Sequence, residues 1–185
     1  MDVQVTVQGL DKVVAKLDGQ KLFGPPMKNF FTRATLALKE QAMAELGADG
    51  AGGAGYDTGH LLRSHATDVD PSPLPRWGVM GTNVPYGVYV HEGTRPHFPP
   101  PTALLDWVHR HHMAGAESIT TRRRAGNRLN QYWEDLEVAF LIARHIAKYG
   151  TKANPWMRRA MEKSIGKLEA LVGELASEVE ARWRA

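Results

Sequence analysis

The chain of 185 residues contains no cysteine. This absence excludes a disulfide framework, a thiolate metal site and a cysteine nucleophile. The sequence also has no apolar run near the roughly 20 residues that a membrane-spanning helix needs. Its first residues lack the basic and apolar regions of a signal peptide. These absences predict a soluble protein that is made in the cytoplasm and has no membrane partner.

An excess of one charge is missing as well. The formal net charge of +3 is too small to predict nucleic-acid binding from bulk charge. Basic residues gather locally in one polar segment that contains glycine, namely Arg122, Arg123, Arg124 and Arg128. Two interpretations of this segment stay open. It is either a solvated loop or a surface that meets DNA or an acidic partner.

No arrangement typical of catalysis is present. Paired zinc ligands on a helix lie four residues apart, and His109, His111 and His112 do not have this spacing. The carboxylates are scattered over different predicted elements, so no acid–base pair stands out. We therefore predict no catalytic residue, no metal site, no cofactor and no enzymatic activity. A histidine-dependent metal hydrolase is the alternative of another class.

Apolar periodicity predicts the elements. Alternation predicts strands over residues 3–7, 66–70 and 76–82, with a proline-rich turn between the last two. Helical spacing predicts helices that begin near residues 10, 27, 102, 132 and 155, and single helical turns after Thr58 and at residues 86–91. We expect the latter turn to lay Tyr86, Tyr89 and Val90 against the sheet. Residues 113–130 are polar, which predicts a flexible insertion within one domain of residues 1–185.

The last predicted helix carries the most regular apolar stripe. Its members recur at alternating steps of four and three: Met161, Ile165, Leu168, Val172, Leu175 and Val179. Such a stripe is typical of a helix packed in the core of its own subunit or of a coiled-coil-like seam. Both interpretations, the core and a seam against a neighbouring subunit, stay open at this point.

Three short motifs follow one another along the chain. Residues 58–64 read Thr-Gly-His-Leu-Leu-Arg-Ser, and residues 86–94 read Tyr-Gly-Val-Tyr-Val-His-Glu-Gly-Thr. Residues 150–160 read Gly-Thr-Lys-Ala-Asn-Pro-Trp-Met-Arg-Arg-Ala. The order of these motifs resembles the neck and tail-completion proteins of long-tailed double-stranded DNA bacteriophages. These are small proteins that join the head to the tail.

The resemblance implies an α+β fold, in which a long helix packs on a small antiparallel sheet. The mid-chain segment from Thr102 to Tyr149 departs from the shortest family pattern and is expected to add two further helices and a loop. The resemblance also implies a structural protein of the virion neck that forms a homo-oligomeric ring, six-fold to match the tail. The partners would be the adjoining connector or stopper, tail terminator or tail tube proteins, with genomic DNA passing through the channel. A tail terminator ring that caps the tail tube is the alternative.

Contacts between subunits need exposed apolar and charged residues. The candidates for a ring interface are Tyr86, Tyr89, Val90, Glu92, Trp107 and Trp156. Glu92 has a second interpretation, in which its carboxylate pairs with Arg63 or accepts hydrogen bonds from the following turn. Gly93 lies between Glu92 and Thr94, and this position predicts a turn with positive φ.

Overall fold

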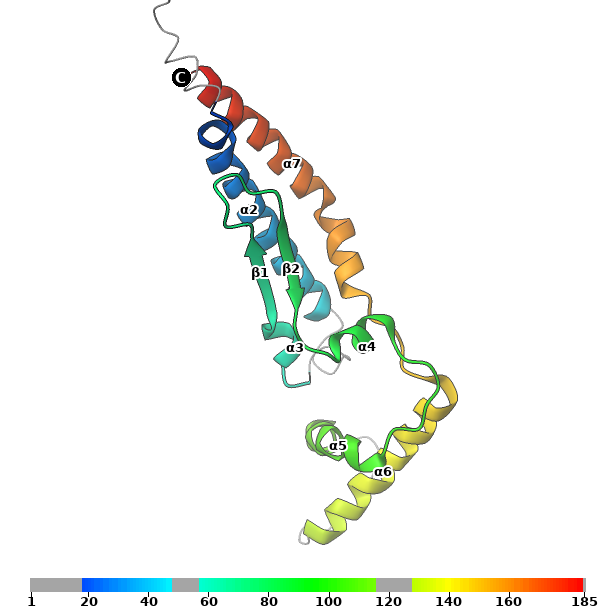
Figure 1. The fold of residues 1–185 in the computed structure, drawn as a ribbon. Coiled ribbons are helices and arrows are strands. Elements are labelled where there is room, and N and C mark those ends of the chain that lie inside the picture. Colours follow the sequence, from blue (N-terminus) through cyan, green and yellow to red (C-terminus); the bar gives the residue numbers. More distant parts are fainter. Residues whose placement is uncertain (1–17, 48–56, 116–127, 185) are drawn as a thin grey trace, which may run out of the picture. The chain divides into compact units, whose positions relative to one another are not determined.

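The computed structural model describes residues 18–47, 57–115 and 128–184, without the side chains of residues 112–115 and 128–131. The fold is α+β, which confirms the predicted class: helices predominate, and one two-stranded antiparallel sheet lies beside long helices (Figure 1). The chain divides into two compact units. Among the described residues, unit 1 holds 18–45, 64–83 and 157–184, and unit 2 holds the remainder. The predicted strand at residues 3–7 and helix from residue 10 lie outside the described residues.

The sheet of unit 1 is a hairpin. Strands β1 (His65–Val69) and β2 (Gly78–Thr82) pair antiparallel, with His65 opposite Thr82 and Val69 opposite Gly78. These bounds lie within one or two residues of the predicted strands. His65, Thr67 and Val69 turn inward on β1, whereas Ala66 and Asp68 are exposed. On β2 the inward residues include Gly78, and Val79 is 56% exposed.

A buried carboxylate organises the turn of the hairpin. Asp70 accepts hydrogen bonds from the backbone N–H groups of Ser72 and Arg76, each at 3.0 Å. These bonds favour the ionised form, and the Ser72 amide is the main reason that the pKa of Asp70 lies below its usual value. The prolines predicted the turn, but the role of Asp70 follows only from the structure.

Helix α2 (Gly19–Gly47) begins earlier than the sequence predicted. The sequence predicted a start near residue 27, after Pro25 and Pro26, but both prolines lie inside the helix. Asp18 supplies the start instead, because its carboxylate accepts a hydrogen bond from the Gln20 amide at 3.1 Å. Close packing on the hairpin also favours this helix: a Cβ atom on Gly78 would lie 2.8 Å from Thr35 Cγ2.

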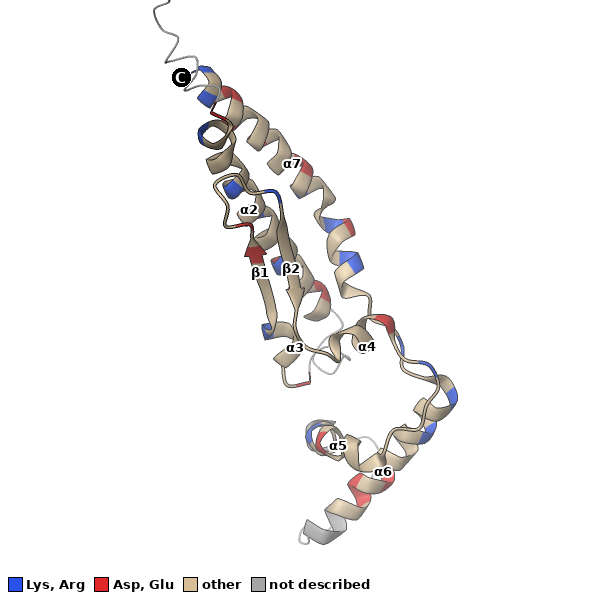
Figure 2. Ribbon diagram, in the orientation of Figure 1, with Lys and Arg blue, Asp and Glu red and all other residues tan. Residues whose placement is uncertain are grey.

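Helix α7 (Trp156–Arg184) lies alongside α2 in unit 1 (Figure 1). Charged residues of both signs are distributed along α7 (Figure 2), and several of them reach α2. Glu174 pairs with Arg33, Lys167 lies 3.7 Å from Glu40, and Lys163 lies 2.6 Å from Glu45.

The predicted stripe of α7 divides into two sets. The buried row of the helix consists of Ala160, Ser164 and Leu171, beside half-buried members of the stripe. Three other members of the stripe stay about half exposed: Met161 at 53%, Ile165 at 51% and Val172 at 52%. The core interpretation therefore holds for one edge of the stripe, and the other edge faces outward.

The most concentrated set of polar contacts in unit 1 centres on Glu45. This buried residue accepts hydrogen bonds from Lys163 at 2.6 Å, from Arg159 at 3.1 Å and from Gln41 at 2.9 Å. Arg159 also donates to the main-chain carbonyl of Glu45 at 3.1 Å. The Lys163 ammonium is the main reason that the pKa of Glu45 lies below its ordinary value. Glu45 thereby fixes the position of α7 along α2.

Unit 2 is built from helices. Its elements are α3 (His60–Arg63), α4 (Gly87–Glu92), α5 (Pro101–Gly115) and α6 (Arg128–Tyr149). Helices α5 and α6 pack against each other, and the His109 ring donates a 3.0 Å hydrogen bond to buried Asp135 between them. Helix α5 extends to Gly115 and α6 begins at Arg128, so both helices reach into the predicted insertion at residues 113–130. Residues 116–127 of that prediction lie outside the described residues. None of the described helices is long and apolar enough to cross a membrane.

The Glu45 contacts give a prediction that depends on pH. Glu45→Gln should lower the free energy of unfolding at pH 7 by about 1–2 kcal/mol, because it removes charge-assisted hydrogen bonds. The folded-state pKa of Glu45 is depressed, so this stabilisation is present above the unfolded pKa of about 4.3 and is lost as pH falls through the folded pKa.

Urea unfolding of both proteins between pH 7 and pH 3 measures this difference. The matched control is Glu40→Gln, since Glu40 is 74% exposed and pairs more loosely with α7. That change should cost less than about 0.5 kcal/mol. A Glu45→Gln effect that stays constant down to pH 3 would contradict the assignment of the charge to these contacts.

Candidate functional site

Two Gly-Thr dipeptides, far apart in the sequence, close unit 2 on itself. Thr94 and Thr151 form an antiparallel bridge in which each backbone N–H donates to the other carbonyl at 3.2 Å. Their hydroxyl oxygens lie 3.0 Å apart. Both preceding residues, Gly93 and Gly150, have a φ of 72°, which confirms the positive φ predicted for Gly93.

Only glycine fits these two positions. A Cβ atom on Gly93 would clash with the Thr151 carbonyl oxygen and would lie 2.9 Å from the amide of Ala153. A Cβ atom on Gly150 would clash in the same way with the Thr94 carbonyl oxygen. The motifs at residues 86–94 and 150–160 are therefore two halves of one structure. This structure holds α4 against the segment that leads into α7. There the backbone N–H of Asn154 donates to the Val90 carbonyl at 3.0 Å.

A pocket of about 210 Å³ lies beside α4 in unit 2. Three of the predicted interface residues line it, namely Tyr86, Val90 and Trp107, and the structure thus brings together side chains that are 21 positions apart. The opposite wall comes from the first motif, since residues 57–61 line the pocket as well. Both polar and apolar side chains line this pocket.

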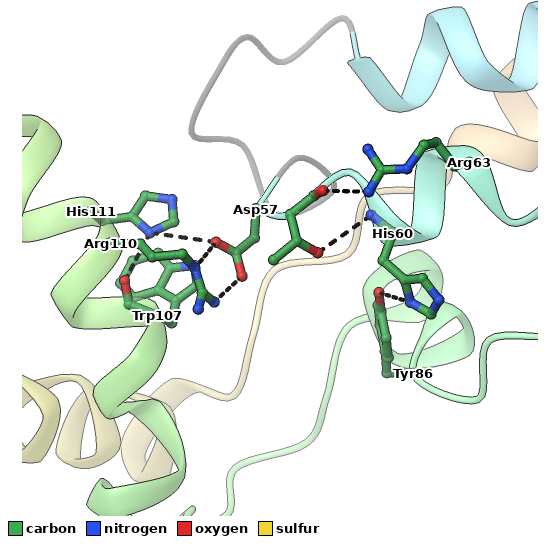
Figure 3. A network of polar contacts seen from close by, with 8 residues as sticks. Asp57, His60, Arg63, Tyr86, Trp107, Arg110 and His111 are labelled. Atoms are coloured by element: carbon green, nitrogen blue, oxygen red, sulfur yellow. Dashed lines mark hydrogen bonds and ion pairs between the residues drawn. The ribbon is translucent and has the colours of Figure 1, made fainter.

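An ion pair holds one wall of this pocket (Figure 3). Asp57 receives two hydrogen bonds from the Arg110 guanidinium, and the bond from Nε is 2.8 Å long. This contact is the main reason that the pKa of Asp57 lies below its usual value and the pKa of Arg110 lies above. The His111 ring stacks on Trp107 with 4.2 Å between centroids and donates to the Trp107 carbonyl at 2.9 Å. Trp107 is therefore held in a fixed orientation.

A second set of contacts positions the other wall. His60 Nδ1 lies 3.3 Å from the Tyr86 hydroxyl oxygen, and the Thr58 hydroxyl accepts a hydrogen bond from the His60 amide at 3.4 Å. The Arg63 guanidinium donates to the Thr58 carbonyl at 2.9 Å. Gly59 has a φ of 70°, and a Cβ atom there would lie 2.7 Å from the Arg63 guanidinium. The Thr-Gly-x-Leu-x-Arg motif thus folds into a compact turn that presents His60 to Tyr86.

The remaining predicted interface residues lie in different surroundings. Tyr89 is 62% exposed on α4, and Tyr86 is 44% exposed, so neither side chain is buried within unit 2. Glu92 accepts a 2.6 Å hydrogen bond from His91, its neighbour in the sequence, rather than from Arg63. Trp156 is 1% exposed and meets the His91 ring edge-on at 5.1 Å, so its side chain belongs to the interior.

The basic candidates carry no structural description. Arg122, Arg123 and Arg124 lie outside the described residues, and Arg128 begins α6 without a described side chain. Two of the histidines weighed as metal ligands have other partners: His109 pairs with Asp135, and His111 donates to the Trp107 carbonyl at 2.9 Å. Across the described ranges, no group of three or more histidine, aspartate or glutamate residues could hold a metal ion.

Sequence reasoning missed Asp57 and Arg110. Both are common surface residue types, and 53 positions separate them, so nothing in the sequence pairs them. The one available signal was position, since Asp57 directly precedes the Thr58-Gly59 turn. Because its carboxylate is already engaged by Arg110, Asp57 orients the wall and is poorly placed to accept a proton from a substrate.

The glycine bridge gives a prediction about stability. Gly93→Ala should lower the free energy of unfolding by about 1–3 kcal/mol, because the new Cβ meets backbone atoms at a positive φ. The matched control is Gly166→Ala in α7, where a Cβ has open space. That change should be neutral or stabilise by up to about 1 kcal/mol. Thermal melting of the two variants checks both values, and equal melting temperatures would show that the bridge does not constrain the fold.

The described geometry therefore consists of a closed bridge, an exposed helix α4 and a small pocket at its side. No protein-family model, no curated protein sequence and no solved structure matches this chain. Any proposal of function therefore depends on the chemistry of the described residues and on the order of the three motifs.

Proposed function

We propose that this protein is a structural component of a bacteriophage neck, where copies of it form a ring that completes the tail or joins it to the head. In this role the protein binds neighbours and does no chemistry. The neighbours are further copies of the chain and the adjoining connector, stopper, terminator or tube proteins. The order of the three motifs supports this proposal, because it is the order found in proteins of that class.

One structural observation carries the contact between copies, namely the exposed apolar groups of unit 2. Val88 is 64% exposed and Tyr89 is 62% exposed on α4, next to half-exposed Tyr86. We call these three residues the α4 surface. Isolated exposed apolar residues are common, but a cluster on one short helix that also borders a pocket is typical of a contact surface.

Further large apolar residues are exposed along α6 of the same unit. Trp133 is 63% exposed, Phe140 49% and Leu141 57%, and we call these residues the α6 surface. A closed ring needs a heterologous interface, in which each subunit offers two different surfaces to its two neighbours. Unit 2 carries two such surfaces, and we infer that the α4 surface of one copy meets the α6 surface of the next.

The alternative position, a terminator ring that caps the tail tube, uses the same surfaces and the same symmetry. The two positions differ in the neighbouring proteins and not in the contacts between copies. We further propose that Arg122, Arg123, Arg124 and Arg128 face the DNA that passes through the ring, since a run of guanidinium groups in a polar segment suits phosphate contacts.

The ring interface gives a prediction for purified protein. Val88→Lys or Leu141→Lys should each abolish self-association, because a charge then enters an apolar contact. Neither change should alter the melting temperature, since both side chains are more than half exposed. The control is Val79→Lys on the exposed face of β2, where the new cation lies opposite Asp68. This control should associate as the unmodified protein does in sedimentation over a range of concentrations.

A mixture of the two variants distinguishes a head-to-tail ring contact from the contact of a symmetric dimer. Each variant keeps one intact surface, so a Val88→Lys copy can still pair once with a Leu141→Lys copy. Head-to-tail contact therefore predicts heterodimers and no larger species in the mixture. If the mixture stays monomeric while the unmodified protein associates, the α4 surface does not meet the α6 surface.

The basic segment gives a separate prediction for DNA. Replacing the four arginines with serine should weaken binding to double-stranded DNA and reduce the slope of log K against log salt by up to about 3.6, at roughly 0.9 per phosphate contact. The control removes four exposed cations of unit 1 instead, namely Lys21, Lys28, Arg182 and Arg184. Equal slopes in the two variants would show that the effect is one of net charge alone, and an unchanged slope would exclude the contact.

A further inference from the structure

We propose that residues 1–17 of this chain bind in an apolar groove of unit 1, between the first turns of α2 and the last turns of α7. The groove measures about 690 Å³. Its lining is almost wholly apolar and includes Phe23 and Met27 from α2 and Val172, Val179 and Trp183 from α7. It lies in unit 1 and is distinct from the pocket beside α4.

The groove exposes large side chains to solvent. Phe23 is 40% exposed, Val172 52% and Trp183 49%. Two helices in contact bury one stripe each, and the flanks of that contact stay open unless a third element covers them. Covering apolar surface contributes roughly 25 cal/mol per Å². An apolar groove of this size along a helix pair is therefore a binding surface for a further amphipathic segment.

Residues 1–17 are the favoured occupant because they directly precede α2, which forms one side of the groove. The described chain begins at Asp18, and the groove lining begins within the next turn at Leu22. A tether this short keeps the segment at an effective concentration of about a millimolar, which disfavours competition by a second copy at micromolar protein.

The composition and length of the segment also fit. Leu10, Val13, Val14 and Leu17 recur at the spacing i, i+3, i+4, i+7 that gives one apolar face to a helix. The α7 lining from Val172 to Trp183 spans about 16 Å at 1.5 Å per residue. Residues 10–17 would cover about 12 Å of it as a helix, and the preceding residues can cover the rest.

The absence of cysteine allows a direct test on the full chain. The variant carries Val14→Cys and Ala176→Cys, in which Ala176 is a small, exposed residue of the groove lining. A short bismaleimide added at micromolar protein should join the two thiols within one chain, which proteolysis and mass spectrometry detect. The matched control pairs Val14→Cys with Ala170→Cys, an exposed α7 position outside the groove lining. Its intrachain yield should be at least about tenfold lower, as the tether alone does not hold the segment there.

A third variant adds Val13→Asp and Leu17→Asp to the reactive pair. These charges should reduce its yield to that of the control and should speed amide hydrogen exchange in residues 172–179, where the cover is lost. Equal yields at positions 176 and 170 would overturn the proposal. Crosslinks between chains at position 176 would overturn it as well, because they would assign the groove to a second copy.

Discussion

The contact between Thr94 and Thr151 is the constraint on which unit 2 depends. The chain leaves this point after Gly93, builds α5 and α6, and returns through Gly150 to the same place. Both glycines adopt a φ of 72°, so two backbone segments approach more closely than any side chain would allow. The bridge holds α4 at a fixed place beside residues 151–156 while the α5–α6 excursion lies outside it.

The sequence predicted the elements better than their ends. Alternation and helical spacing located the hairpin, α4 and the long helices, because these patterns follow directly from which side chains face inward. The start of α2 was missed since Pro25 and Pro26 normally mark a first turn, whereas here Asp18 caps the helix earlier. Gly24 lies in this extension and packs so closely on the hairpin turn that a Cβ atom would clash with the Pro73 carbonyl oxygen. In the stripe of α7, periodicity identified the apolar residues but could not tell the buried edge from the exposed one.

The sequence also predicted some residues of the candidate site and missed others. Tyr86, Val90 and Trp107 were recognisable as apolar residues in a polar context, and they line one pocket. Asp57 and Arg110 were not recognisable, because an ion pair across 53 positions leaves no local pattern. Trp156 shows the opposite error, since a large aromatic residue beside a proline was taken for a surface group and is buried against His91. Contacts of high sequence separation are the part of a site that composition and spacing do not encode.

Polar contacts around Glu45 fix a helix pair, and a glycine-dependent bridge presents an exposed α4. We propose that these surfaces serve assembly. The central claim is that the α4 surface is buried between copies in a closed ring. Electron cryomicroscopy of the assembled particle tests it most directly. The account predicts a closed ring of equivalent copies, six by the resemblance, in which Tyr86, Val88 and Tyr89 contact the neighbouring copy. A single copy per particle, or a ring whose α4 residues face solvent, would contradict the claim.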